Sequence, residues 1–515
     1  MTGPAIETRW LITGHLASKT AVRALTGYTV TETGADGNPH EVMLFVRNSG
    51  GRPMLPGSSL KGVLRDWLAR RVAGPQEQSL RKIFGTPPAG VANGIHKISH
   101  GGAAEFHDAA ATASDAIRNW TGTAIDRDTR SAAKKLLANR QEAQEGTVFD
   151  VTITASGLEL ADVELLLAGL DGFGADDPVA IGATTGGGLG RMAWTLAKVQ
   201  KLDQAVVKAW LAQRGGQVFD VWARQSGVGN IPFPAAATLI DNAASLAATL
   251  TLDFKSPLIV ATKIAKTAAA PERLVHVTRA GGQYYLPGSS IIGALRSQAE
   301  KILRTINADA VPERGAETGK LHVVEQIFGS ARVSRALRID EMSLVGAASP
   351  YAKERLAVDR LTGTVAGDKK FVEEYLEAPV FSGTVHLDLA RTPLDPALAG
   401  KTSDNTVPGT PGLDAAALGL LLLLWRDLQE GDVHFGRGAA AGYGACTASL
   451  APARLSTNAM AALNAIAPEC AKALGDWAAG KPVTATMREA LANEAVTALL
   501  VRLAPDPAKL EGEQP

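Results

Sequence analysis

An internal repeat is the sequence feature that most constrains the fold of this chain of 515 residues. The segment MLFVRNSGGRPMLPGSSLKGVLR, which begins at Met43, aligns without a gap with LVHVTRAGGQYYLPGSSIIGALR, which begins at Leu274. Roughly half of the aligned positions are identical, which chance rarely produces. Further matches follow in the same order, and each copy ends in a glycine-rich loop, GATTGGGLGRM from Gly182 and GRGAAAGYGAC from Gly436. The chain is therefore predicted to contain two tandem copies of one domain.

The two copies share one order of hydrophobic patterns. Alternating stretches such as WLITGHLAS and GTVFDVTITA are typical of strands, and apolar residues at helical spacing follow Ser58 and Ala161. The resulting order, β-α-β-β-α-β, is that of the ferredoxin-like split unit. We therefore predict an α+β protein with two tandem ferredoxin-like domains and a helical C-terminal tail. Long insertions precede the first helix and separate the second and third strands of each copy, and we expect them to be functional or disordered loops.

These patterns also predict the domain boundaries. The first domain spans 1–200, a helical linker 201–245, the second domain 246–450, and an alanine-rich helical tail 451–515.

Composition limits the function classes. Lys plus Arg equals Asp plus Glu at 52 each, so any contact with nucleic acid has to come from local basic patches. Two cysteines, Cys446 and Cys470, cannot build a disulfide framework or a four-cysteine zinc site. The longest apolar run, near Leu420, is too short to span a bilayer, and the N-terminus has no apolar signal core. We expect a soluble cytoplasmic protein with no membrane partner.

The repeated turn has an anion-binding pattern. Pro56-Gly57 predicts a tight turn, and Ser58 or Ser59 is placed to cap the following helix. The amides at such a helix start favour a phosphate, and Lys61 and Arg65 lie on the same helical face. The alternative is a capped helix whose serines only satisfy backbone donors.

Copy two keeps Ser289, Ser290 and Arg296 but has Ile292 in place of Lys61, so its basic contact is predicted to be weaker. The glycine loops allow a backbone to approach a ligand closely, although tight turns before an edge strand explain them equally well. Neither loop has the Gly-Lys-Ser/Thr ending of a nucleoside triphosphate loop.

Together, the paired LPGSS helix starts, the Asp-Arg elements of AIDRDTR and AVDRLTG, and the terminal glycine loops resemble the repeat-associated mysterious protein (RAMP) superfamily, in particular backbone subunits of type III CRISPR effector complexes. The resemblance covers roughly residues 8–200 and 246–450. It implies two fused backbone subunits that hold a guide RNA (crRNA) and position complementary target RNA in antiviral defence. It also implies partners: further backbone subunits, a large polymerase/nuclease subunit and a small subunit.

The resemblance carries over to individual residues. It implies that a long insertion in each copy acts as a thumb, an element that displaces a base of the guide RNA at intervals. The thumbs are expected within about 112–145 and 346–382, around Asp126-Arg127 and Asp359-Arg360. The implied RNA-binding residues are Ser58, Ser59, Lys61, Arg65, Arg127, Gly188, Gly190, Arg191, Ser289, Ser290, Arg296, Arg360, Arg437, Gly442 and Gly444.

Cleavage of target RNA is a further implication, since in several backbone subunits a loop aspartate before the Pro-Gly-Ser turn cleaves with a divalent cation such as Mg²⁺. Copy one offers Asp36, with Glu41 nearer the family spacing, whereas copy two offers Glu272 and no aspartate. The alternative for Asp36 is a turn residue in ADGN. The metal ligands are not determined by the sequence, and His96, His100 and His107 are more simply surface or RNA-facing residues.

Two other functions compete with this interpretation. One is a stand-alone endoribonuclease that processes the guide precursor, and the other is an enzyme that binds a phosphorylated small molecule in a compact pocket. Both copies keep both motifs and both insertions, which favours the backbone subunit. The aromatic content of 5% predicts no stacking platform for bases, so RNA contact is expected to be independent of base sequence.

Overall fold

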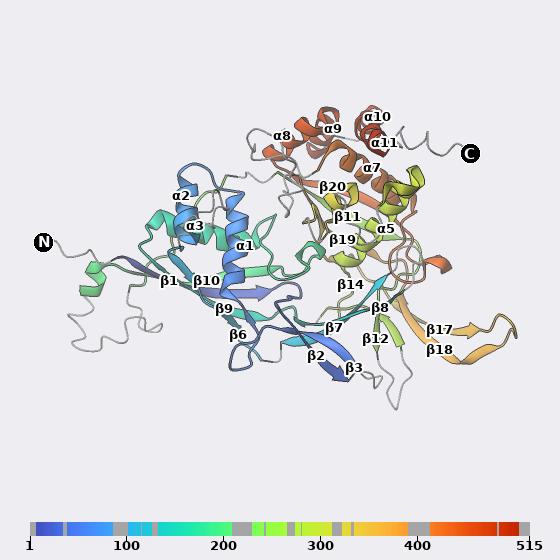
Figure 1. Ribbon diagram of the computed structural model, residues 1–515, viewed down its shortest axis with the longest axis horizontal. Coiled ribbons are helices and arrows are strands. Elements are labelled where there is room, and N and C mark those ends of the chain that lie inside the picture. The colour runs from blue at the N-terminus through green and yellow to red at the C-terminus, as the bar shows by residue number, and fades with distance from the viewer. Residues whose placement is uncertain are drawn as a thin grey trace, which may run out of the picture. The chain divides into compact units, whose positions relative to one another are not determined.

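The computed structural model describes residues 7–33, 39–85, 101–114, 116–125, 132–208, 229–240, 244–264, 273–279, 281–311, 322–330, 334–389, 413–481 and 484–503. Its internal contacts divide the chain into two compact units (Figure 1). Unit 1 comprises Met1–Thr185 and Leu189–Asn242, and unit 2 comprises Gly186–Gly188 and Ala243–Pro515.

The central sheet of unit 1 has the strand order β10-β1-β9-β6-β4, and β5 also pairs with β9. Its strands are β1 (Arg9–Ser18), β4 (Met54–Leu55), β5 (Ala104–Phe106), β6 (Ala109–Ala111), β9 (Val148–Ser156) and β10 (Met192–Leu202). The strands pair antiparallel throughout. Alternate residues of β1, including Trp10, Ile12 and Leu16, are buried because successive side chains of a strand point to opposite faces. This order is that of the predicted ferredoxin-like unit.

Helices cover this sheet. They are α1 (Gly57–Ala69), α2 (Pro75–Phe84) and α3 (Leu160–Asp171), followed by the short 3₁₀ turns η1 (Gly172–Gly174) and η2 (Thr185–Gly187). α1 buries one face, with Leu60, Leu64, Trp67 and Leu68 in the core. α3 is apolar on nearly all sides and is almost completely buried, since one side packs on the core of the sheet and the extended segment 229–240 packs against the helix as well.

Unit 2 repeats this architecture, with the strand order β14-β16-β19-β11-β20 and β15 on β19. Its strands are β11 (Ser245–Phe254), β14 (Tyr285–Leu286), β15 (Leu337–Ile339), β16 (Met342–Leu344), β19 (Val380–Asp388) and β20 (Cys446–Leu455). Its helical elements are α5 (Gly288–Ile306), η4 (Ala308–Ala310), α6 (Val323–Phe328), α7 (Ala415–Glu430) and η6 (Ala439–Ala441). The predicted α+β class with two equivalent domains is confirmed.

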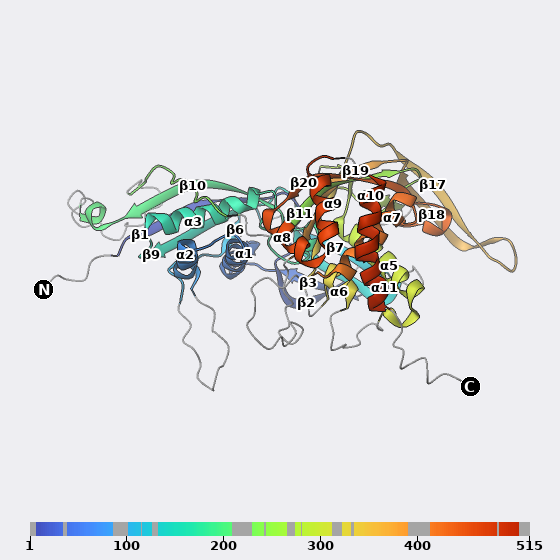
Figure 2. The ribbon, with the colours of Figure 1, turned by 90° about the horizontal axis from the view of Figure 1, so that it is seen from above.

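The long insertions are not simply loops, which corrects the expectation from the sequence. In each unit the two insertions form one four-stranded sheet, β2-β3-β8-β7 in unit 1 and β12-β13-β18-β17 in unit 2. The strands are β2 (Leu25–Thr33), β3 (Pro39–Phe45), β7 (Ile117–Ile125), β8 (Ala132–Ala143), β12 (Ala261–Ile264), β13 (Arg273–His276), β17 (Pro350–Val358) and β18 (Val365–Leu376). A parallel ladder joins the insertions, through Val42↔Asn139 in unit 1 and Leu274↔Glu373 in unit 2. The β17–β18 hairpin reaches away from the central sheet of its unit (Figure 2).

The segment that follows each copy packs against the unit to which that copy belongs. In the predicted linker, 204–208 are helical and 229–240 are extended along unit 1, where the Ala237 amide donates to the Glu164 carbonyl of α3 over 3.0 Å. In unit 2 the first residues of the predicted tail complete β20, and the described residues beyond it are helical; the C-terminal end of this helical part packs against α7 (Figure 1). The helical part consists of α8 (Thr457–Ile466), α9 (Pro468–Ala478), α10 (Ala485–Leu491), a π-helical turn η7 (Ala492–Val496) and α11 (Thr497–Leu503).

The tail touches α7 at a glycine. A Cβ on Gly419 would lie 2.2 Å from the Ala495 carbonyl oxygen, so only glycine permits this approach. Across the described part of the chain, every helix is too short or too polar to cross a lipid bilayer.

Candidate nucleic-acid interface

The repeated turn places a glycine, not a serine, at the first residue of each helix. The N-cap residue of α1 is Pro56, and no side chain caps the helix. The Ser59 amide instead donates to the Pro56 carbonyl over 2.9 Å, and Ser58 and Ser59 are both exposed. The prediction that Ser58 or Ser59 caps the helix is therefore wrong, and both hydroxyls lie on the surface.

A close backbone approach explains why the glycine occurs in both copies. A Cβ on Gly57 would lie 2.0 Å from the Phe106 carbonyl oxygen, and one on Gly288 would lie 2.2 Å from the Ile339 carbonyl oxygen. Phe106 ends β5 and Ile339 ends β15, so the same contact fixes each first helix against its sheet. Part of the repeated motif is thus required by packing alone.

The start of α1 already holds an anion from the same chain. The carboxylate oxygen Oδ1 of Asp108 accepts a hydrogen bond from the Gly57 amide over 2.8 Å. Negative charge at a helix N-terminus is favourable because the first amides point outward with partial positive charge. A phosphate bound at this helix start would compete with Asp108 for the Gly57 amide.

The exposed face of α1 carries the remaining candidate residues. Ser58, Lys61, Gly62 and Arg65 lie at the i, i+3, i+4 and i+7 spacing that places residues on one side of a helix. Lys61 and Arg65 are half-exposed, and neither has a hydrogen-bond or ion-pair partner within the described ranges. Both cations are therefore available to an anionic ligand.

The corresponding face of α5 is less basic. Ser289 is exposed and Ser290 is half-exposed, but Ile292 is buried in the core. The Arg296 guanidinium donates to Glu300 over 3.2 Å and to the Gly329 carbonyl over 2.9 Å. Arg296 is thus engaged within unit 2, whereas the described residues offer no such partner to Lys61 or Arg65 of α1.

The two glycine loops have the same backbone shape. Positive φ angles occur at Gly182, Thr184, Gly188 and Gly190 in the first loop and at Gly436, Gly438, Gly442 and Gly444 in the second. A Cβ on Gly190 would lie 2.0 Å from the Ile181 carbonyl oxygen, and one on Gly444 would lie 1.9 Å from that of Phe435. The last glycine of each loop is therefore needed for the turn itself.

A family model for the RAMP superfamily matches residues 6–193 and 251–447. The chain belongs to the RAMP superfamily. The two matched stretches coincide with the two copies, so the protein is a tandem pair of RAMP domains. Membership indicates RNA binding in a CRISPR system. Comparison with curated proteins finds no match to the chain.

The loop arginines of the two RAMP domains differ in exposure. Arg191 is buried, and its guanidinium donates to the Pro178 carbonyl over 3.4 Å. The side chain of Arg437 is 55% exposed and donates to Glu373 over 3.0 Å. Of the two, Arg437 is the one whose charge reaches the surface.

The Asp-Arg element of the second RAMP domain is the tip of the β17–β18 hairpin. The Asp359 carboxylate accepts hydrogen bonds from the Leu361 and Thr362 amides over 2.8 and 2.9 Å. These bonds lower the pKa of Asp359, with that from Thr362 as the largest cause. Asp359 therefore shapes the turn, while Arg360 and Leu361 are left exposed, Leu361 to 98%. The matching Asp126-Arg127 of the first RAMP domain lies outside the described residues.

Of the predicted catalytic residues, only some lie in the part of the chain that the structure describes. Asp36 and Glu272 lie outside the described residues, as do His96 and His100. Glu41 is exposed on β3, opposite Thr31 of β2. His107 is exposed, and its Nε2 lies 3.1 Å from the Thr154 hydroxyl.

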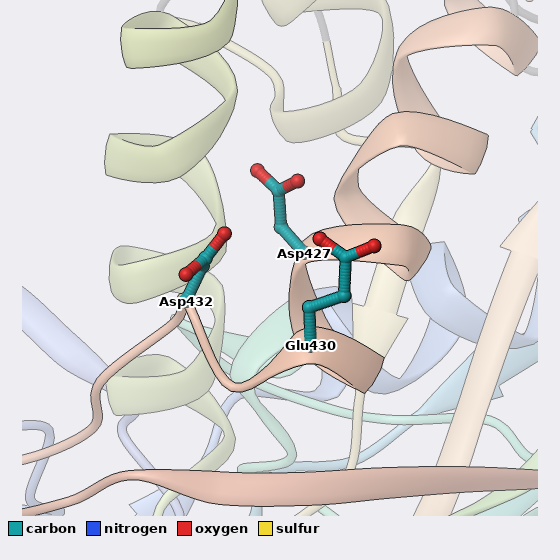
Figure 3. Close-up of side chains that lie close together, drawn as sticks. All are labelled: Asp427, Glu430 and Asp432. Carbon is teal, nitrogen blue, oxygen red and sulfur yellow. The ribbon is translucent and has the colours of Figure 1, made fainter.

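One acidic group in the described part of unit 2 has the spacing of a metal site. Asp427, Glu430 and Asp432, at the end of α7 and in the turn after it, offer carboxylate oxygens within 4.8 Å of one another (Figure 3). The Asp427 carboxylate, however, accepts hydrogen bonds from Gln298 and Arg426, both over 2.6 Å. Arg426 thus already supplies a cation to this cluster, and its pKa is raised by the hydrogen bond to Asp427.

The two cysteines belong to the apolar core of unit 2. Both are buried, and burial raises the pKa of Cys446 and of Cys470 to about 12. Their thiols are neutral at physiological pH, and only a thiolate is a good ligand or nucleophile.

Proposed function

We propose that this tandem RAMP protein is a backbone subunit of a type III CRISPR effector complex, equivalent to two fused subunits. It holds the guide RNA along the exposed faces of α1 and α5 and positions complementary target RNA. Its partners are the guide and target RNA and the other effector subunits, namely further backbone subunits, a large polymerase/nuclease subunit and a small subunit.

A pair of exposed helix glycines carries this proposal. Gly62 of α1 and Gly293 of α5 occupy the same position of the repeat, five residues after the helix-starting glycine, and both are exposed. A Cβ at either position would meet no atom within 4 Å, so packing within the protein does not require glycine. Glycine inside a helix is less stable than alanine by about 0.5–1 kcal/mol. Glycine nevertheless occurs at both positions despite this loss of helix stability. We attribute it to a bound RNA backbone that approaches each helix too closely for a side chain.

The charges beside Gly62 fit a polyanion. Lys61 and Arg65 flank it on the same face, and Ser58 adds a hydroxyl. Contacts of this kind are made to the phosphates and sugars and do not depend on the base sequence. A protein that accepts any guide requires such sequence-independent binding. Because Arg296 is engaged by Glu300, unit 1 is proposed to hold the RNA more strongly than unit 2.

The β17–β18 hairpin supports a thumb role. Its tip presents Leu361 and Arg360 to solvent, with Val358 and Val365 also exposed, at 60% and 47%. An apolar side chain beside a cation suits insertion next to a base while the cation pairs with a phosphate.

Metal-dependent cleavage of target RNA is the finer part of the proposal. It rests on Asp36 and Glu41, because Mg²⁺ is commonly held by one or two carboxylates together with substrate phosphates. Glu41 is exposed and belongs to no group of three potential ligands in the described chain. Asp36→Ala is expected to abolish one cut in a matched target and leave its binding intact. An identical cutting pattern would exclude Asp36.

The test of RNA holding uses charge reversal on α1. Lys61→Glu combined with Arg65→Glu should strip RNA from the purified complex, measured by the absorbance ratio at 260 and 280 nm and by sequencing the bound RNA. Lys472→Glu with Arg488→Glu, at exposed positions of α9 and α10 away from both helix faces, is the control with the same change in charge. Unchanged RNA content in the Lys61/Arg65 variant, with an unchanged circular dichroism spectrum, would overturn the proposal.

A further inference from the structure

Unit 2 gathers tyrosines at the junction of its second sheet and its glycine loop. The chain has six tyrosines, and three of them, Tyr351, Tyr375 and Tyr443, form a continuous cluster. The ring centroids of Tyr351 and Tyr375 are 5.4 Å apart, and those of Tyr375 and Tyr443 are 5.5 Å apart. Tyr375 and Tyr443 are each 8% exposed, whereas Tyr351 is 54% exposed. Two buried rings thus support a third ring that faces solvent.

The strand that carries Tyr351 continues this surface with positive charge. Tyr351, Lys353 and Arg355 alternate along β17, so they share one face of the sheet. Their partners on β18 are Tyr375, Glu373 and Phe371. The face therefore runs from an exposed ring to two basic residues.

A buried carboxylate fixes the arginines of this face. Glu373 is 2% exposed, and its two oxygens accept hydrogen bonds from Arg355 over 2.8 Å and from Arg437 over 3.0 Å. The Arg355 guanidinium also lies 4.9 Å from the centre of the Tyr443 ring. Lys353 pairs with Glu373 in the β17–β18 ladder, and the charge of the exposed Glu377 acts on Tyr375. Three cations, Lys353, Arg355 and Arg437, therefore stand against two carboxylates.

We propose that this surface is a nucleotide-binding platform, on which Tyr351 stacks against a base of single-stranded RNA while Arg437 contacts its phosphate. An exposed, preorganised aromatic ring next to cations that are already oriented is the arrangement by which single strands are bound without sequence preference. The inference rests on the proposed function, which provides the RNA, but it assigns a contact separate from the exposed helix faces. The low aromatic content predicted no such platform, and the fold creates one by bringing distant tyrosines together.

Unit 1 has a related arrangement, but in it the aromatic ring is already covered by an arginine of the same unit. Glu142 is 1% exposed and accepts hydrogen bonds from Arg23 and Arg118 over 2.9 and 2.8 Å. The Arg23 guanidinium lies 4.0 Å from the centre of the Trp120 ring and is itself buried. Because Arg23 already stacks on Trp120, we assign the platform to unit 2 alone.

The experiment measures binding of a fluorescein-labelled oligouridine to the full chain, freed of bound RNA at high salt, by fluorescence anisotropy. Loss of one base–aromatic stack weakens binding by about 5-fold to 150-fold. Tyr351→Ala should show a loss in this range, whereas Tyr351→Phe, which keeps the ring, should change the dissociation constant less than about 2-fold. Tyr28→Ala is the matched control, because Tyr28 is 76% exposed on β2 of unit 1.

The outcomes separate this inference from the proposed function. If Tyr351→Ala binds like wild type while the Lys61/Arg65 variant loses binding, the platform is wrong and the proposed function stands. Failure of the wild-type chain to bind RNA would overturn both. A Tyr351→Ala variant that loses self-association in analytical ultracentrifugation but keeps RNA affinity would also overturn the platform, since the ring would then serve a protein contact. Ultraviolet crosslinking of RNA to the Tyr351 peptide is expected in the wild type.

Discussion

The carboxylate of Asp108 lies 2.8 Å from the backbone amide of Gly57, at the first residue of the helix whose face we propose to hold RNA. The two residues belong to different elements, since Asp108 follows β5 and Gly57 begins α1. This hydrogen bond stabilises the helix start, but it also places a negative charge where an RNA phosphate would bind.

Asp108 is therefore expected to oppose RNA binding while it supports the fold. Asp108→Asn keeps an oxygen acceptor for the Gly57 amide and removes the charge, so RNA affinity should rise with little change in melting temperature. Asp108→Ala should lower stability by about 1 kcal/mol, as the loss of a helix-start acceptor does. Anisotropy titrations and thermal unfolding measure the two effects, and weaker RNA binding by Asp108→Asn would contradict the expectation.

Two glycines of α1 should respond in opposite directions to the same substitution. Gly57→Ala places a Cβ 2.0 Å from the Phe106 carbonyl oxygen, so the helix or β5 must move, and we expect a loss of about 3 kcal/mol. Gly62→Ala fills open space and should stabilise the helix by about 0.5–1 kcal/mol.

The decisive readout is RNA affinity. Gly62→Ala should weaken RNA binding although it stabilises the protein, because the added methyl group would lie between the helix and the RNA backbone. Denaturant unfolding of this variant measures the expected gain in stability, and fluorescence anisotropy measures the expected loss of RNA affinity. A stabilised Gly62→Ala variant with wild-type affinity would remove the main support for the helix-face site.

His276 should make unit 2 less stable in mild acid. Its Nδ1 lies 3.2 Å from the Val260 amide, which donates to it, and its Nε2 lies 3.0 Å from the Tyr285 carbonyl. Burial lowers the pKa of His276, and backbone hydrogen bonds only partly offset this. The unfolded chain, with a histidine pKa of about 6.5, therefore binds more protons than the fold, so stability is full above that pH and falls below it.

The slope attributable to His276 can reach about 1.4 kcal/mol per pH unit in this acid range. Thermal unfolding between pH 5 and 8 measures it, with His276→Phe as the comparison because Phe45 occupies the equivalent position of unit 1. The variant should show a flatter pH profile even if its overall stability is lower. Parallel profiles for the two proteins would exclude a role for His276.

The C-terminal tail should detach when its contact with α7 is blocked. Gly419→Ala would place a Cβ 2.2 Å from the Ala495 carbonyl oxygen, and backbone cannot move aside as a side chain can. We expect faster proteolysis of the tail and a lower melting temperature, read by limited trypsin digestion and scanning calorimetry. Gly475→Ala is the control, because its Cβ would meet only the flexible end of Met460 at 3.1 Å. Equal digestion of both variants would show that the Gly419 contact does not hold the tail.

The sequence by itself determined the duplication, the ferredoxin-like order and the helix faces. These features follow from local patterns: the period of apolar residues sets helix or strand, and a Pro-Gly turn sets where α1 and α5 begin. The face with Lys61 and Arg65 could be placed for the same reason, since helical spacing alone puts them together.

Only the tertiary structure decided what depends on contacts between distant segments. It paired β3 with β8, so that insertions expected to be loops became a sheet, and it brought Asp108 to Gly57 and Tyr443 to Tyr375. It also gave the repeated glycine its reason, because the Phe106 carbonyl that excludes a side chain comes from another strand. Such contacts are set by packing across the sheet and leave no periodic signal in the segments that form them.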